Sequence, residues 1–127
     1  MHGVEFRTRI VIFVLALACV ADASPAHART DFDGDWSIFI VTHEGACEAS
    51  LRYGVKVADG TVINDGGSIA TVQGRVSPRG TVRVLVRSGN QWANGSGHLG
   101  RNHGNGIWRG QGTSGTCAGT WVAGRRE

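Results

Sequence analysis

The chain lacks the pattern on which helical folds depend, and this narrows the fold class. No window after residue 30 carries apolar residues at the three-to-four spacing of an amphipathic helix over three turns. Glycine, which occurs 20 times and is frequent in the second half, disfavours helices further. We therefore expect no helix after the N-terminal segment. The formal net charge of +3 permits attraction to anionic partners without requiring it.

Catalytic and cofactor motifs are missing as well. There is no Gly-x-Ser-x-Gly turn around a nucleophilic serine, and no Cys-x-x-Cys pair. Of the five histidines, His43, His98 and His103 lie beyond the N-terminal segment and are scattered, with no acidic or cysteine ligand at a diagnostic metal-binding spacing. We expect no catalytic residues, no cofactor and no metal, and we interpret the protein as non-enzymatic.

The N-terminus has the three parts of a secretory signal. Arg7 and Arg9 precede an apolar run from Ile10 to Val20, which is too short to span a bilayer comfortably. The second of two small-x-small sites is Ala26-His27-Ala28. We predict a signal peptide over residues 1–28, cleaved after Ala28, and an exported, periplasmic or extracellular protein. A retained membrane anchor is the alternative.

Removal of the signal leaves one domain, residues 29–127, with no transmembrane span. Cys19 leaves with the signal, unless the protein is a lipoprotein acylated at that residue. The mature chain then keeps Cys47 and Cys117. An even pair of cysteines in a small exported domain indicates a disulfide bond.

Alternation of apolar and polar residues dominates the mature chain and indicates β-strands. It is clearest between Cys47 and Val57, and that stretch closes on Ala58-Asp59-Gly60, a strong hairpin signal. The other predicted strands are 36–42, 61–64, 68–76, 81–87, 91–99, 105–110 and 116–123. We predict an all-β fold, a small antiparallel up-and-down meander of seven or eight strands that closes into a β-barrel.

Glycines recur at the positions predicted to face the barrel interior, namely Gly95, Gly97, Gly106, Gly110 and Gly119. Glycine lets a small barrel coil its strands and leaves room for large neighbours. We predict that Trp36, Trp108 and Trp121 are core and closure residues that fill the interior, because a barrel this small is usually filled by its own side chains. The alternative is that they line a ligand pocket. We expect the Cys47–Cys117 bridge to form over the end of the first strand and seal that end.

Two ends of the chain resemble calycin-like barrels, the group that includes lipocalins, avidin-like proteins and small periplasmic inhibitors of bacterial metalloproteases. Gly34-Asp35-Trp36 matches the Gly-x-Trp that begins their first strand, and Gly119-Thr120-Trp121 is followed by Arg125 and Arg126. The resemblance implies a late basic residue packed across Trp36. It also implies inhibition of a secreted protease as one functional alternative.

The whole mature chain is similar to short, exported, uncharacterised bacterial β-proteins. This resemblance is extensive but implies no activity. The shared segments are Trp36, Gly45-Ala46-Cys47, Tyr53, Gly95-Ser96-Gly97-His98-Leu99, Gly104-Asn105-Gly106-Ile107-Trp108 and Cys117-Ala118-Gly119-Thr120-Trp121.

Arginines gather on one predicted outer face. Arg83 and Arg87 share the outer side of one strand, Arg75 lies outward on the strand before it, and Arg79 lies in the turn between them. Trp92 is predicted to point outward beside them. We predict a candidate binding patch for an anionic polysaccharide or another acidic envelope component, and we do not expect nucleic acid. The simpler alternative is a solvated face that discourages aggregation.

These observations favour a non-enzymatic exported β-barrel that binds a partner in the cell envelope or outside the cell. The specific partner does not follow from the sequence. Inhibition of a secreted protease is the first alternative, and a small hydrolase is the second.

Overall fold

The computed structural model describes residues 30–66 and 70–126, and these residues form an all-β fold without a helix. The predicted signal peptide, its cleavage after Ala28 and the lipidation of Cys19 lie outside the described residues. The eight strands are β1 (Gly34–Glu44), β2 (Ser50–Ala58), β3 (Thr61–Asn64), β4 (Thr71–Val76), β5 (Thr81–Ser88), β6 (Gln91–Leu99), β7 (His103–Gly112) and β8 (Gly115–Arg125).

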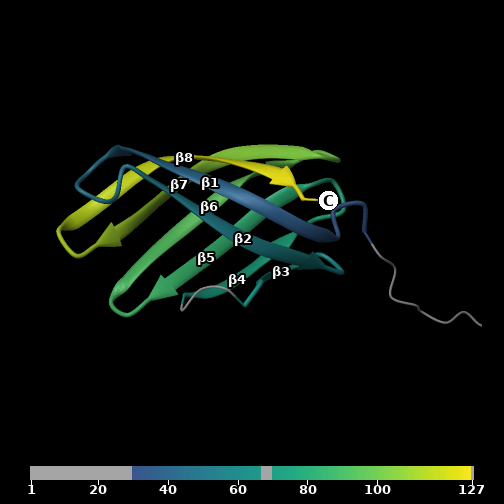
Figure 1. Ribbon diagram of the computed structural model, residues 1–127, viewed down its shortest axis with the longest axis horizontal. Coiled ribbons are helices and arrows are strands. Elements are labelled where there is room, and N and C mark those ends of the chain that lie inside the picture. The colour runs from purple at the N-terminus through teal and green to yellow at the C-terminus, as the bar shows by residue number, and fades with distance from the viewer. Residues whose placement is uncertain (1–29, 67–69, 127) are drawn as a thin grey trace, which may run out of the picture.

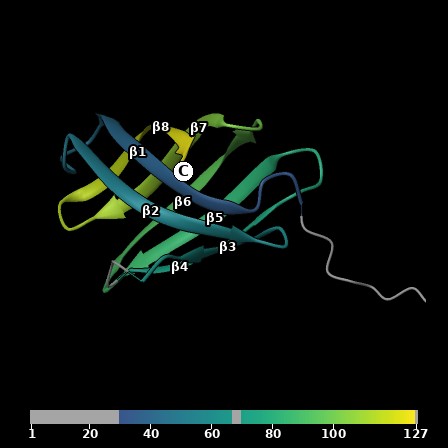
Figure 2. The same cartoon turned by 45° about the vertical axis from the view of Figure 1, so that its right-hand side comes forward.

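Each strand pairs antiparallel with the next one along the chain, and β8 pairs with β1 to close the barrel. Figures 1 and 2 show the strands winding around one interior, with short β3 and β4 on one side and long β1, β7 and β8 on the other. The predicted all-β meander that closes into a barrel is confirmed, with eight strands. Closure gives every strand a neighbour on both sides, with the shortest pairings where β3 meets β2 and β4.

The predicted start of the second strand at Cys47 is wrong. β2 begins at Ser50, and Cys47 lies in the loop between β1 and β2. Thr42 near the end of β1 holds this loop, because its amide donates to the carbonyl of Ala49 (2.9 Å) and its hydroxyl donates to the carbonyl of Glu48 (2.6 Å). The alternation of apolar and polar residues therefore begins in the loop, before β2, and in the loop it does not indicate a strand.

One end of the barrel, here called the closed end, carries the N-terminal segment and the turns after β2, β4 and β6. The hydrophobic core gathers there, around the side chain of Trp36, which is 1% exposed. The other buried core residues are Phe32, Val57, Val62, Val76, Val82, Leu99, Trp121 and Ala123. At the opposite end, here called the open end, the loops after β1, β3, β5 and β7 surround the barrel mouth.

Arg125 locks the closed end. Its guanidinium carbon lies 4.6 Å from the centroid of the Trp36 ring. The same guanidinium donates to the carbonyls of Asp33 (2.6 Å), Asp31 (2.7 Å) and Arg101 (2.9 Å). The Arg125 side chain therefore covers the buried indole. It also holds the N-terminal segment and the turn after β6 in place through hydrogen bonds.

The Cys47–Cys117 pair lies at bonding distance, with Cα atoms 6.1 Å apart and a sequence separation of 70. It joins the β1–β2 loop to β8, the two neighbours of the end of β1. A disulfide of this kind is typical of an oxidising compartment, such as that met by an exported protein. The bridge does not seal its end of the barrel, because Cys47 lines a cavity that remains open beside it.

Candidate binding cavity and outer face

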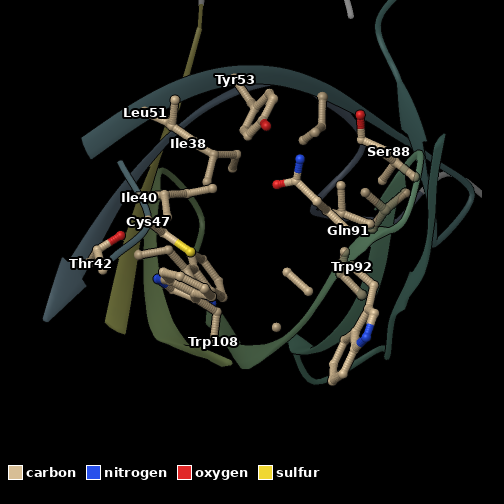
Figure 3. A pocket seen from close by; sticks show the side chains of 18 of the residues that line it. Ile38, Ile40, Thr42, Cys47, Leu51, Tyr53, Ser88, Gln91, Trp92 and Trp108 are labelled. Carbon is tan, nitrogen blue, oxygen red and sulfur yellow. The ribbon is translucent and has the colours of Figure 1, made fainter. Parts of the chain in front are cut away.

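The barrel interior contains an open cavity of about 390 Å³, within the range of roughly 300–1,000 Å³ typical of small-molecule sites. Figure 3 shows it with side chains from around the barrel directed inward. Most of the lining side chains are aliphatic. They include Ile38, Ile40, Leu51, Val55, Val57, Val62, Val72, Val76, Val82, Val84 and Val86.

Glycines on β6 and β7 make a slot for Trp121. Gly97 and Gly106 lie directly opposite each other, and a Cβ atom at either position would come within 2.6 Å of the Trp121 ring. The indole nitrogen donates to the carbonyl of Ile107, at 3.2 Å. The ring therefore packs against the barrel wall, with its polar atom satisfied by the wall's own backbone.

Trp108 is held in the same manner. A Cβ atom at Gly119, its partner on β8, would lie 2.9 Å from the Trp108 indole nitrogen. That nitrogen donates to the carbonyl of Val41, at 3.1 Å. Because both indoles occupy glycine slots in the wall, the centre of the barrel remains free.

The prediction of a filled interior is therefore wrong. Trp36 and Trp121 are buried core residues, as expected, and Trp108 is partly buried, but all three also line the cavity. The inward glycines leave room for tryptophans, as expected. The space beside these glycines lies in the barrel wall, however. Because the rings lie there, the centre of the barrel is left as the cavity.

Polar side chains are concentrated near the mouth. They are Thr42, Glu48, Tyr53, Asn64, Ser88, Gln91, Gln111, Thr113 and Ser114. Figure 3 shows the Gln91 amide and the Tyr53 ring directed into the opening. Glu48 is the one charged side chain in the described lining, and no cation lines it. The cavity is therefore an apolar pocket with hydroxyl and amide groups and the one carboxylate of Glu48 around its entrance.

The strand register places the predicted arginine patch on the outer face. Arg75 lies directly opposite Arg83, and Arg87 lies directly opposite Trp92, whose side chain is 37% exposed. Figure 3 shows the Trp92 ring at the rim, directed away from the cavity centre. Arg79 lies in the turn between β4 and β5, at the closed end.

Sequence reasoning missed Arg109. This residue lies on β7 opposite Asn94, which in turn lies opposite Leu85, so Arg109 shares the outer face with Arg83 and Arg87. The alternation of Gly106, Trp108 and Gly110 as inward residues could have placed it there. Glycine carries little apolar signal, which hid the pattern.

The histidines are separated in the structure. His43 Nε2 lies 3.0 Å from Thr120 Oγ1 near the open end, whereas His98 and His103 flank the turn at the closed end. Among residues 30–66 and 70–126, no group of three or more His, Cys, Asp or Glu side chains is placed to hold a metal ion. None of the same residues forms a helix long and apolar enough to cross a membrane.

Asp33 carries a perturbed pKa and connects the N-terminal segment to the turn between β2 and β3. Burial acts to raise this pKa, but hydrogen bonds outweigh it and hold the pKa below its ordinary value. The Thr30 hydroxyl donates to the carboxylate at 2.6 Å, and the Asp59 amide donates at 2.9 Å. The group is therefore a structural clamp at the closed end, remote from the cavity mouth.

Comparison of the chain with protein-family models, with curated proteins and with solved structures finds no match.

Proposed function

We propose that the protein is a non-enzymatic exported β-barrel that binds a small, uncharged, largely apolar ligand in its interior cavity. The observation that carries this proposal is the open cavity of about 390 Å³, which is lined by aliphatic and indole side chains. When an apolar ligand replaces water in a solvent-accessible apolar cavity, binding is favoured by about 25 cal/mol per Å² of apolar surface buried.

The charge of the lining selects the ligand class. An unpaired charge is costly to bury, and no cationic side chain lines the described cavity to receive a carboxylate or phosphate. Glu48 at the mouth opposes an anionic head group as well. The hydroxyl and amide groups of Ser88 and Gln91 suit a neutral polar head, such as an alcohol, ester or amide. The ligand that fits is therefore a neutral amphipathic molecule.

The bridge between Cys47 and Cys117 supports export to the periplasm or beyond, where disulfides persist. The predicted signal peptide supports the same location.

The other functional alternatives stay predictions. An inhibitor that acts through its N-terminal segment needs that segment free to enter a protease. Here the segment from Thr30 to Asp33 is tied to the barrel by Arg125 and Asp59. The hydrolase alternative gains no cluster of catalytic groups among the described residues.

Titration with N-phenyl-1-naphthylamine, a neutral apolar fluorophore that brightens in dry sites, tests the proposal. We expect saturable binding that a long-chain alcohol displaces and a fatty acid of equal length displaces less well. Val86→Phe extends a ring into the cavity and should lower the affinity at least tenfold, on the scale of about 1.4 kcal/mol for each tenfold change.

Val122→Phe is the matched control, because Val122 lies on the outer face of β8 and is 50% exposed. It should leave the affinity unchanged. Absence of saturable binding in the wild-type protein, or equal loss in both variants, would refute the proposal.

A further inference from the structure

The outer face of β4 to β8 is hollowed. A groove crosses it between the end of β4 and β8, on the side of the wall opposite to the cavity. The residues that matter for its chemistry are Gln73, Arg83, Leu85, Asn94, Ser96 and Arg109. We call this feature the outer groove.

The strand register gives the layout of the outer groove. One row across the strands runs from Leu85 through Asn94 to Arg109, and the next runs from Arg83 through Ser96. Arg83 on β5 and Arg109 on β7 therefore stand two strand spacings apart across the sheet and two residues apart along the strands, which separates their Cα atoms by about 12 Å. Between them lies a floor of short, uncharged polar side chains.

Among residues 30–66 and 70–126, no ion pair neutralises the positive charge on this face. Arg75 and Arg83 face each other across the β4–β5 pair, and like charges in that position destabilise a sheet. The sequence from residue 66 to residue 126 contains no aspartate or glutamate. Within residues 30–66 and 70–126, Glu44 at the far rim is the acidic side chain that touches the outer groove. An external anion would relieve the repulsion.

We propose that the outer groove binds a linear anionic polysaccharide, independently of the ligand in the cavity. Guanidinium groups bind carboxylate and sulfate through paired hydrogen bonds. The amide of Asn94 and the hydroxyl of Ser96 match the neutral hydroxyl groups of the sugars between the anionic ones. Trp92, exposed beside Arg87 but outside the groove lining, offers a flat apolar face to a sugar ring of a chain that extends beyond the groove.

The shape and composition of the face argue against two other polyanions. A hollowed surface does not meet the flat head-group plane of a bilayer. Single-stranded nucleic acid is held by stacking its bases on several aromatic side chains, whereas Trp92 is the one aromatic residue exposed among the described parts of β4 to β8.

Binding to immobilised heparin and to polygalacturonate, with dextran as the neutral comparison, tests the proposal. We expect the purified protein to bind both acidic polymers, with an affinity that falls as salt is added. We expect no binding to dextran. The double variant Arg83→Gln/Arg109→Gln should lower the affinity at least tenfold, the order expected when two charge-assisted contacts are lost.

Lys56→Gln/Arg101→Gln is the matched control, because it removes the same charge from exposed positions on β2 and in the turn after β6, neither of which lines the outer groove. Its affinity should change by less than about twofold, as for exposed charges outside a contact. Equal losses of affinity in the two double variants would show that binding depends on the net charge of the protein and not on the outer groove. That result would overturn the proposal. So would absence of polysaccharide binding, or tighter binding to single-stranded DNA or to phosphatidylglycerol vesicles.

Ser96→Glu provides a second test that does not depend on removing arginine. It places a carboxylate on the floor of the outer groove and should abolish binding, while Asn102→Glu at a closed-end turn should not. A thermal melt of each variant checks that it is folded. Retained binding in folded Ser96→Glu contradicts the proposal. Ser96→Glu should bind N-phenyl-1-naphthylamine in the cavity with unchanged affinity. The proposal for the outer groove can therefore fail without the proposal for the cavity failing, and the reverse.

Discussion

Trp121 and Gly106 lie directly opposite each other on β8 and β7, and the indole covers the glycine so closely that a Cβ atom there would come 2.6 Å from the ring. This contact places a large core side chain against the barrel wall. The cavity exists because the ring lies there and does not cross the lumen. Four predictions on stability follow below, each with a matched control, and a test of ligand placement closes the account.

Gly106→Ala should destabilise the protein by about 1–3 kcal/mol, the usual cost of overpacking a core. The new methyl group would press on the Trp121 ring and on the Ser96 carbonyl, so the ring must move toward the cavity. Denaturant unfolding measures the loss. Gly124→Ala is the control, since nothing lies within 4 Å of a Cβ atom there, and it should shift stability by less than about 0.5 kcal/mol. Equal effects would show that the slot is not tight.

Arg125→Ala should destabilise the protein by about 2 kcal/mol, because it removes the contact with Trp36 and leaves three carbonyls without their donor. Arg126→Ala, at the adjacent position, removes one exposed ion pair with Asp65 at 3.2 Å. The loss there should be under about 1 kcal/mol. Thermal melts of the two variants decide the matter, and the account fails if Arg126→Ala is the more damaging.

Reduction of the Cys47–Cys117 bridge should lower the free energy of unfolding by about 4 kcal/mol. The bridge closes a loop with a sequence separation of 70, and this figure is the chain-entropy value for a loop of that length. Unfolding curves with and without dithiothreitol measure the loss. The variant Cys47→Ser/Cys117→Ser should have the same free energy of unfolding as the reduced protein, and dithiothreitol should not change it. Unchanged stability on reduction would contradict the prediction.

Asp33→Asn should destabilise the protein near pH 7 but not near pH 2. The folded-state pKa of Asp33 is lowered, so its stabilisation is present above the unfolded pKa of about 3.9 and is lost as the pH falls through the folded-state value. Melting temperatures of wild type and variant at the two pH values measure this. Asp31→Asn, an exposed neighbour, is the control. A gap between wild type and Asp33→Asn that persists unchanged at pH 2 would show that charge is not the cause.

The sequence predicts the barrel well where alternation and turns agree. The strand from Gln91 to Leu99 has the predicted bounds, and its pairing of Trp92 with Arg87 follows from the short turn of Gly89 and Asn90. Alternation fails at Cys47, where apolar residues continue into a loop held by Thr42. The failure is physical, because a loop that folds back over a strand end also needs apolar contacts.

The cavity could not be read from the sequence. Whether three tryptophans fill a barrel depends on where their rings lie, and Trp121 is placed by glycines on two other strands. The sequence shows those glycines and their inward position, but not that they receive the ring. The outer face was predicted in part, because Arg109 joins it only through the register of β7 with β6.

The most direct test of the central claim locates a neutral ligand in the protein. Nuclear Overhauser effects between 1-decanol and the methyl groups of the protein measure which valines and isoleucines the chain touches. The account predicts effects to the inward methyls of Val72, Val84 and Val86. Effects confined to the outward methyls of Ile107 and Val122, or no effects at saturating decanol, would contradict it.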